Sequence, residues 1–206
     1  MADRRQAGRR QEYAEATRQA IIDAARQLFA ERGYFGTRIE DIAAAARVAP
    51  ATVYAGFKSK FGLIQALVDA WSTAPSISAT DEDILRLDDP VAIIRLVAAR
   101  ARGMRVEYGD IMRTLVVTAP NDEAVAAVTR QANDTYRQAL TRISQRIADV
   151  GELRDGVDVR KATDMLWLYF GYAGLFVMHD DNGWTWDEAE DWLAEQAIHA
   201  LLADRG

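Results

Sequence analysis

Residues 37–67 read TRIEDIAAAARVAPATVYAGFKSKFGLIQAL, and this stretch decides the fold of the N-terminal part of the chain. Thr37 and Glu40 have the spacing of a capping box, which starts a helix by satisfying its first N–H groups. Apolar residues then recur at helical spacing, as one face of a short helix. Residues 47–49 leave room only for a turn. Pro50 begins the next helix, because its fixed φ suits the first helical position.

This second helix has one apolar side and one small, mostly uncharged side. Val53 and Phe57 face a core, and the outer side consists of Ala51, Thr52, Tyr54 and Ala55. Two short helices joined by three or four residues, the second with such an outer face, are typical of a helix-turn-helix. The sequence therefore predicts a DNA-binding unit.

The stretch resembles the DNA-binding domain of TetR-family transcriptional regulators. Their pattern is a Thr, a short helix ending Ala-x-x-Ala-Gly-Val, a turn, and a hydrophobic-Tyr-x-x-Phe-x-x-Lys segment. The matching residues here are Thr37, Ala43, Ala46, Val48, Thr52, Val53, Tyr54, Phe57, Ser59 and Lys60. The family's first helix is matched by Ile21, Ala24, Ala25, Leu28, Phe29 and Gly33, the last a natural helix stop. The resemblance covers residues 17–67, about a quarter of the chain.

Two residues depart from the family pattern. Arg47 stands where a glycine is common, at a turn position that often needs φ > 0, and a non-glycine residue there costs on the order of 1 kcal/mol. Gly56 stands where the family often has His or Tyr, so we expect one contact with the DNA backbone to be missing. Affinity would then depend more on the arginines near the N-terminus.

The resemblance implies that Tyr54 and Lys60 contact the phosphate backbone. Small methyl-bearing side chains on the second helix suit thymine methyl groups in the major groove, and Thr52 is the main polar group there. We expect the DNA-binding residues to be Thr37, Arg38, Arg47, Pro50, Ala51, Thr52, Tyr54, Lys58 and Lys60. The alternatives are that Tyr54 is a packing residue and that Lys60 is an ordinary solvated lysine.

Charge is distributed unevenly along the chain, whose net charge is −6. Residues 1–62 hold 11 Lys and Arg against 7 Asp and Glu, whereas the remainder holds 14 against 24. This asymmetry favours one segment that faces nucleic acid. The absence of cysteine excludes disulfides and thiolate metal sites. The longest apolar run, residues 165–178, is shorter than the roughly 20 residues of a spanning helix. We therefore expect a soluble, cytoplasmic protein with no membrane partner.

The helical patterns divide the chain into three segments. Residues 1–16 carry four arginines and no apolar period, and they are either a disordered tail or a flexible basic arm that reaches DNA. Residues 17–60 form the helix-turn-helix domain, and residues 61–206 form a larger ligand-binding and dimerisation domain with a loop over residues 74–88. Helices are expected over residues 60–73, 90–108, 110–118, 121–151, 158–179 and 185–201. No stretch shows strand alternation, so the fold class is all-α with about nine helices.

The order of the later helices resembles the family's regulatory domain, which encloses a small-molecule pocket and dimerises through its last two helices. Aromatic and methionine side chains dominate such pockets, and the candidates are Trp71, Met104, Tyr108, Met112, Tyr136, Trp167 and Tyr169. The candidates for the dimer interface are Phe170, Gly171, Gly174, Leu175, Met178, Trp192, Ala197 and Leu201. Taken singly, each pocket residue fits plain core better than a ligand contact, and the last two helices also fit a helix pair buried within one chain.

These features predict a ligand-responsive repressor that binds a palindromic DNA operator as a homodimer and is released by a small hydrophobic molecule. An enzyme is the main rival, but the chain has only two histidines and no phosphate-binding glycine loop. His179-Asp180-Asp181 is better interpreted as a solvated helix end than as a metal site. A scaffold role remains an alternative for the C-terminal half. We predict no catalytic residue, metal or cofactor.

Overall fold

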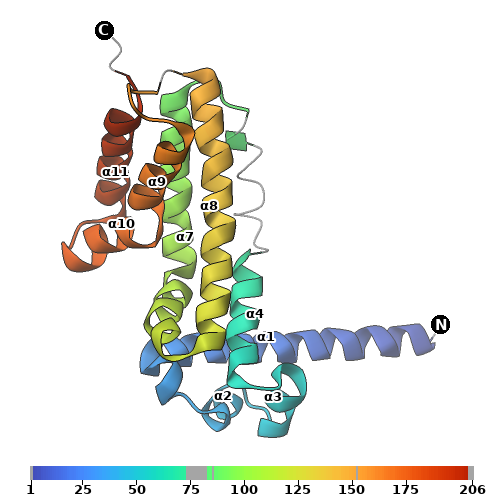
Figure 1. Ribbon diagram of the computed structural model, residues 1–206. Coiled ribbons are helices and arrows are strands. Elements are labelled where there is room, and N and C mark those ends of the chain that lie inside the picture. Colours follow the sequence, from blue (N-terminus) through green and yellow to red (C-terminus); the bar gives the residue numbers. More distant parts are fainter. Residues whose placement is uncertain (1, 73–82, 85, 152, 204–206) are drawn as a thin grey trace. The chain divides into compact units, whose positions relative to one another are not determined.

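The computed structural model describes residues 2–72, 83–84, 86–151 and 153–203 (Figure 1). The helices are α1 (Ala2–Gly36), α2 (Ile39–Ala45), α3 (Pro50–Phe57), α4 (Lys60–Ser72), α7 (Pro90–Thr118), α8 (Glu123–Val150), α9 (Val159–Phe170), α10 (Tyr172–Phe176) and α11 (Trp186–Leu201). A 3-10 turn, Ala119–Asn121, and a π-turn, Val177–Asp181, join them. In the described ranges the sole β-type pairing is an isolated bridge, Leu153 to Leu202. The prediction of an all-α chain is confirmed.

The chain divides into two compact units. Unit 1 is Met1–Ser72 with Asp110–Thr129, and unit 2 is Thr73–Gly109 with Arg130–Gly206. The sequence placed a boundary after residue 60, but α4 groups with unit 1, and α7 and α8 contribute residues to both units. The predicted loop over residues 74–88 lies largely outside the described residues. No described helix combines the length and apolarity needed to cross a bilayer.

The first helix of unit 1 is longer than the sequence analysis expected. Instead of a flexible arm over residues 1–16, α1 runs from Ala2, where Ala, Gln, Glu and Arg favour helix and no proline interrupts it. The predicted stop at Gly33 is confirmed by its φ of 72°. The core of unit 1 follows the predicted apolar faces and includes Ile21, Ala25, Phe29, Ile42, Val53, Phe57, Leu63, Ile64 and Leu67.

Helix α7 is continuous, and the predicted break at residue 109 is wrong. A single glycine costs a helix only about 1 kcal/mol, which the surrounding contacts exceed. The next residue, Asp110, accepts two hydrogen bonds from Arg26 of α1, at 2.6 Å from Nε and 2.7 Å from Nη2. Burial raises the pKa of Asp110, but the hydrogen bonds and charge of Arg26 outweigh it, and the pKa lies below its ordinary value.

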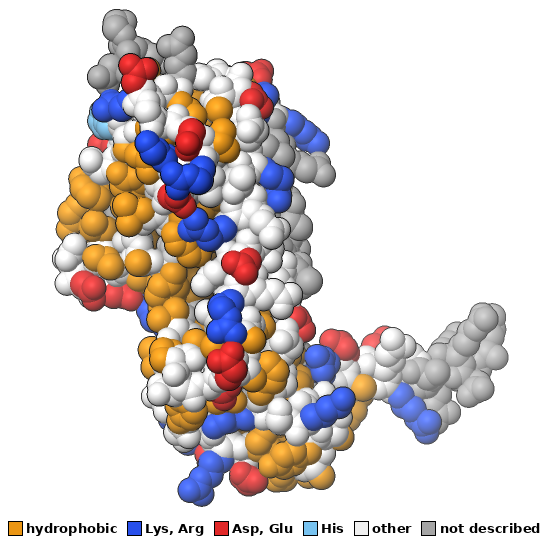
Figure 2. All heavy atoms as spheres, viewed as in Figure 1, with side chains coloured by type: hydrophobic (Ala, Val, Ile, Leu, Met, Phe, Trp, Pro, Cys, Tyr) orange, Lys and Arg blue, Asp and Glu red, His pale blue; other side chains and the backbone are white. Residues whose placement is uncertain are grey.

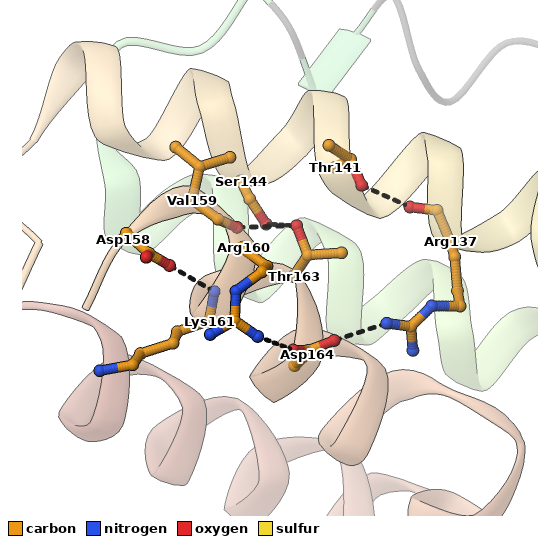
Figure 3. A network of polar contacts seen from close by, with 9 residues as sticks. All are labelled: Arg137, Thr141, Ser144, Asp158, Val159, Arg160, Lys161, Thr163 and Asp164. Atoms are coloured by element: carbon orange, nitrogen blue, oxygen red, sulfur yellow. Dashed lines mark hydrogen bonds and ion pairs between the residues drawn. The ribbon is translucent and has the colours of Figure 1, made fainter.

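The core of unit 2 is built mainly from apolar faces of α7, α8, α9, α10 and α11. Its largest fully buried side chains are Ile84, Ile93, Ile94, Leu140, Ile147, Leu166, Phe170 and Leu175. Figure 3 shows the polar contacts between α8 and α9, where Thr163 donates to Ser144 at 3.2 Å and Arg137 pairs with Asp164 at 2.5 Å. The predicted cap Asp158 is confirmed, because its carboxylate accepts the Lys161 N–H at 2.7 Å.

The helix predicted over residues 158–179 is interrupted at Gly171, whose ψ is −169°. A Cβ at this position would lie 2.2 Å from the Trp167 carbonyl oxygen, so only glycine fits the junction. The chain then forms α10 and the π-turn before α11 begins. The capping box that starts α11 is confirmed: Thr185 N–H donates to Glu188 at 2.8 Å, and Glu188 N–H donates to Thr185 Oγ1 at 3.2 Å.

Candidate functional site

The tight turn between α2 and α3 follows from the sequence around Arg47. Backbone N–H groups of Arg47 and Val48 donate to the carbonyls of Ala44 and Ala43, at 3.1 and 2.9 Å, and close the end of α2. Pro50 then stands in the first turn of α3, as predicted. The two helices and their turn therefore have the expected helix-turn-helix connection.

Helix α3 presents the outer face that the sequence predicted. Val53 and Phe57 are buried, whereas Ala51, Thr52, Tyr54 and Ala55 are exposed. Tyr54 is 48% exposed, so about half of its surface is accessible to solvent. The face is small enough for the helix backbone to come close to a base-pair edge.

Thr37 lies elsewhere than predicted. Its side chain is 1% exposed, and its hydroxyl donates to the carbonyls of Gly33 at 2.8 Å and Leu28 at 3.1 Å. The α1 backbone leaves helical geometry at Gly33, and the Thr37 hydroxyl supplies a donor to the carbonyl of that residue. The predicted Thr37–Glu40 capping box is therefore wrong, and the buried hydroxyl is not available to a phosphate.

We expect Thr37→Val to lower the free energy of unfolding by about 1–3 kcal/mol, because a buried hydrogen bond to the Leu28 carbonyl and a partly buried one to the Gly33 carbonyl are lost. Urea unfolding followed by circular dichroism measures the change. Thr52→Val is the matched control, since Thr52 is exposed on α3 and a surface substitution changes stability by at most about 0.5 kcal/mol. Equal stability of the two variants would contradict the assigned role of Thr37.

The Asp41 carboxylate, not that of Glu40, accepts the backbone N–H at the start of α2. This N–H belongs to Arg38, the N-cap residue, and the distance to Asp41 Oδ2 is 3.1 Å. The capping interaction is thus shifted by one residue from the predicted pair. Arg38 itself is exposed beside the N-terminus of α2, where a phosphate is favourably placed.

The Lys60 side chain contacts backbone carbonyls and an aromatic ring of unit 1 instead of extending into solvent. Its ammonium donates to the carbonyls of Tyr34 at 2.6 Å and Thr37 at 3.1 Å, and lies 4.3 Å from the centroid of the Tyr34 ring. Burial lowers the pKa of Lys60, while the charge of Asp122 acts in the opposite direction. The structure thus assigns this lysine to the link between α4 and the end of α1, and its contact with a phosphate stays a prediction.

Arg47 and Lys58 have strained backbones on either side of α3. Arg47 has φ 57°, as the sequence predicted, and Lys58 has φ 64°, which the sequence analysis missed. In the described part of the chain they are the only non-glycine residues with positive φ. Both are exposed and basic, and strain of this kind is concentrated at functional sites. The recognition helix is therefore flanked by two cations in costly conformations.

We expect removal of residues 1–10 to flatten the dependence of DNA affinity on salt by several units of slope. Each phosphate contact contributes a slope of about −0.9, and the segment carries Arg4, Arg5, Arg9 and Arg10. Fluorescence anisotropy over a salt series measures the slope. Replacing the same four arginines with glutamine separates charge from helix length. An unchanged slope in both variants would contradict the prediction.

Comparisons with known proteins agree with this geometry. Residues 21–67 match the family described as bacterial regulatory proteins, tetR family. Over 193 residues the chain is 30% identical to the HTH-type transcriptional repressor BepR of Brucella suis biovar 1, an alignment that covers 92% of this chain and 77% of that protein. The chain belongs to the TetR family. It is accordingly a DNA-binding transcriptional regulator of the helix-turn-helix type.

Solved structures show that the TetR-family fold extends over nearly the whole chain. A transcriptional regulator from Saccharomonospora viridis in complex with choline superposes with a TM-score of 0.74 at 20% identity, covering 92% of this chain and 98% of the other. The regulator FadR of Bacillus subtilis in complex with stearoyl-CoA gives 0.71 at 22% identity, covering 88% and 98%. The predicted arrangement, an N-terminal helix-turn-helix and a C-terminal helical domain, is confirmed.

The predicted pocket residues of this TetR-family chain fall in both units. Trp71 and Met112 belong to unit 1, and the others, Met104, Tyr108, Tyr136, Trp167 and Tyr169, belong to unit 2. Within unit 2 the rings of Tyr136 and Trp167 lie 5.9 Å apart, and both pack against the hydrophobic core, as does Tyr169. The structure thus brings three of the candidates to one core, where they are half-buried.

Several predicted dimer residues are buried in the core of their own unit. Phe170, Leu175, Ala197 and Leu201 are fully buried, and Gly171 is buried at the α9–α10 junction, so these five are corrected to core positions. A Cβ at Gly174 would lie 2.2 Å from the Tyr169 carbonyl oxygen, so this glycine also serves the chain's own packing. Met178 and Trp192 remain accessible.

Unit 2 has exposed apolar side chains on neighbouring helices, and among Leu168, Val177 and Trp192 the sequence predicted only Trp192 as an interface residue. Figure 2 shows hydrophobic side chains on the face that carries α9, α10 and α11. They include Leu168 at 66% exposed, Val177 at 40% and Trp192 at 38%. Periodicity alone could not separate Leu168 and Val177 from buried positions, because the helix predicted over residues 158–179 is apolar nearly all round.

Proposed function

We propose that this protein is an effector-responsive repressor that binds a palindromic operator as a homodimer. The observation that carries the proposal is the exposed face of α3, bordered by the strained cations Arg47 and Lys58. Insertion of α3 into the major groove would bring Ala51 and Thr52 to base edges and the flanking cations to phosphates. Small methyl-bearing side chains favour an operator in which thymine positions matter.

The homodimer is supported by the exposed apolar residues of α9–α11. Leu168, Val177 and Trp192 give unit 2 an apolar surface of the kind that marks a protein interface. Helix-turn-helix dimers place their two recognition helices about 34–36 Å apart, one turn of DNA. Sedimentation velocity on the full-length protein measures the oligomeric state, and Leu168→Glu should shift the dimer toward monomer.

A small hydrophobic effector is supported by the half-buried aromatic residues of unit 2. Two structural neighbours carry small molecules, choline in one and stearoyl-CoA in the other. Effector binding would favour a conformation of the dimer in which the distance between its two DNA-binding domains no longer matches the operator. The operator would then be released.

A gel-shift assay with a DNA fragment from upstream of the protein's own gene tests the proposed function. The full-length protein should retard this fragment in a gel and leave an unrelated fragment of equal length free. Absence of retardation at low salt would contradict the proposal. The enzyme alternative has little support, since His179 stacks on Trp186 at 3.8 Å and its Nδ1 lies 2.8 Å from the Trp184 carbonyl oxygen.

A further inference from the structure

Arg105 carries a buried positive charge in the middle of unit 2. The residue lies on α7, and its side chain is 3% exposed. Arginine is almost never fully buried without a paired group, because a desolvated charge is costly. A guanidinium at this position therefore needs hydrogen-bond acceptors or an anion close to it.

Three carbonyl groups accept hydrogen bonds from Arg105. Its Nη1 donates to Ala101 at 2.9 Å, and its Nη2 donates to Phe170 at 2.7 Å and Gly171 at 2.6 Å. The last two belong to the end of α9, where carbonyls lack helical partners and carry partial negative charge. The Nε–H group of Arg105 is buried and has no acceptor. One N–H group of the guanidinium therefore has no hydrogen-bond acceptor.

No carboxylate balances this guanidinium in the part of the chain that the structure describes. Burial lowers the pKa of Arg105, while a hydrogen bond to the Tyr136 hydroxyl and the nearby Tyr172 hydroxyl act in the opposite direction. On the same helix, the more exposed Arg102 pairs with Glu190 and with Asp187, the latter at 3.3 Å. The exposed arginine thus has two carboxylate partners and the buried one has none, although a buried charge needs an opposite charge more than an exposed one does.

We propose that Arg105 anchors the carboxylate of the effector, and that the effector is a monocarboxylic acid with an apolar body. This inference rests on the effector-responsive function proposed above. A guanidinium binds a carboxylate through charge-assisted hydrogen bonds, and the unused Nε–H supplies a donor for it. The charge of the ligand neutralises the cation that the chain leaves unpaired.

The surroundings of Arg105 define the rest of the ligand. The Tyr136 hydroxyl donates to the Phe170 carbonyl at 3.0 Å, which places this ring at the same junction. The Trp167 ring lies beside Tyr136, and Tyr172 begins α10. All three rings are half-buried, so the aromatic surface next to the cation extends toward solvent. Such a surface accepts an aliphatic chain or an aromatic ring.

Arg105 contacts the junction at which the helix is interrupted between α9 and α10. The guanidinium holds the carbonyls of Phe170 and Gly171, and a bound carboxylate would compete with them for the same donors. Ligand binding would therefore act on the α9–α10 junction. A purely structural role, in which Arg105 only caps α9, predicts no preference for a charged ligand.

Paired ligands that differ only in charge test the proposal. Octanoate is compared with octanamide, and 4-phenylbutanoate with 4-phenylbutanamide, by isothermal titration calorimetry on the full-length protein at neutral pH. We expect at least one acid to bind about tenfold to a hundredfold more tightly than its amide, the range for hydrogen bonds to a charged group. Arg105→Met should abolish the preference, and Arg105→Lys should retain part of it.

Arg95→Met is the matched control, because Arg95 lies on α7 but is exposed, and its loss should leave the acid preference unchanged. The proposal is overturned if neither acid binds at up to about 1 mM, if acid and amide bind equally, or if Arg105→Met retains the preference. Should Arg105→Met fail to fold, the wild-type pairs and Arg105→Lys still decide. A gel-shift assay with the operator fragment, in the absence of both carboxylic acids, tests the proposed function separately.

Discussion

Ala51→Glu is expected to lower operator affinity by about a hundredfold or more while leaving the fold intact. Ala51 is exposed in the first turn of α3, so the substitution adds a carboxylate to the face proposed to enter the major groove. That carboxylate would stand close to phosphates, and a homodimer would carry two copies of it. Like-charge juxtaposition at an interface costs several kcal/mol, whereas an exposed helical glutamate leaves stability nearly unchanged.

Fluorescence anisotropy with the operator fragment measures this loss, and circular dichroism verifies the fold. Ala127→Glu is the matched control, because Ala127 is an exposed helical alanine of unit 1 on α8, outside the helix-turn-helix. The control should bind within about threefold of wild type. If Ala51→Glu also binds within this range, α3 does not enter the groove in the proposed orientation.

Features governed by neighbouring residues could be predicted from the sequence. Pro50 at the start of α3, the cap at Asp158 and the Thr185–Glu188 box depend on residues at most three positions apart. The positive φ of Arg47 was expected because this residue stands where the family commonly has glycine. The buried face of α3 followed from helical periodicity. In each case the interaction that decides the structure is local, so the sequence contains it directly.

Features that depend on distant partners could not be predicted. The Thr37 hydroxyl bonds to a carbonyl nine residues earlier, and the Lys60 ammonium to one 26 residues earlier. Both side chains bond to backbone carbonyls at or just after the end of α1. A residue pattern records that α1 ends at Gly33 but not which side chain satisfies its carbonyls.

The same limit applies to unit 2. The helix predicted over residues 158–179 is apolar nearly all round, and its periodicity could not distinguish the buried Phe170 from the exposed Leu168. The arginines of α7 look alike in sequence, yet Arg105 is buried at the α9–α10 junction and Arg95 is exposed. The site that we infer for the effector therefore became visible only when α9 was placed against α7.

Arg47→Gly and Lys58→Gly are expected to stabilise the protein and weaken its binding to DNA. Left-handed backbone conformations cost a non-glycine residue about 1–2 kcal/mol, part of which glycine returns as unfolded-state entropy. Each substitution should thus raise the free energy of unfolding by about 0.5–1 kcal/mol. Each also removes a cation proposed to contact a phosphate, so affinity should fall about tenfold or more.

Alanine substitutions at the same two positions separate strain from charge. Arg47→Ala and Lys58→Ala lose the cation but keep a Cβ at positive φ, so they should weaken DNA binding without the gain in stability. Arg38→Gly is a control for the stability measurement, because Arg38 has φ −104° and glycine relieves no strain there. Urea unfolding and anisotropy over a salt series provide the two readouts. If the glycine variants were stabilised but bound DNA as well as wild type, the strain at Arg47 and Lys58 would not be maintained for a phosphate contact.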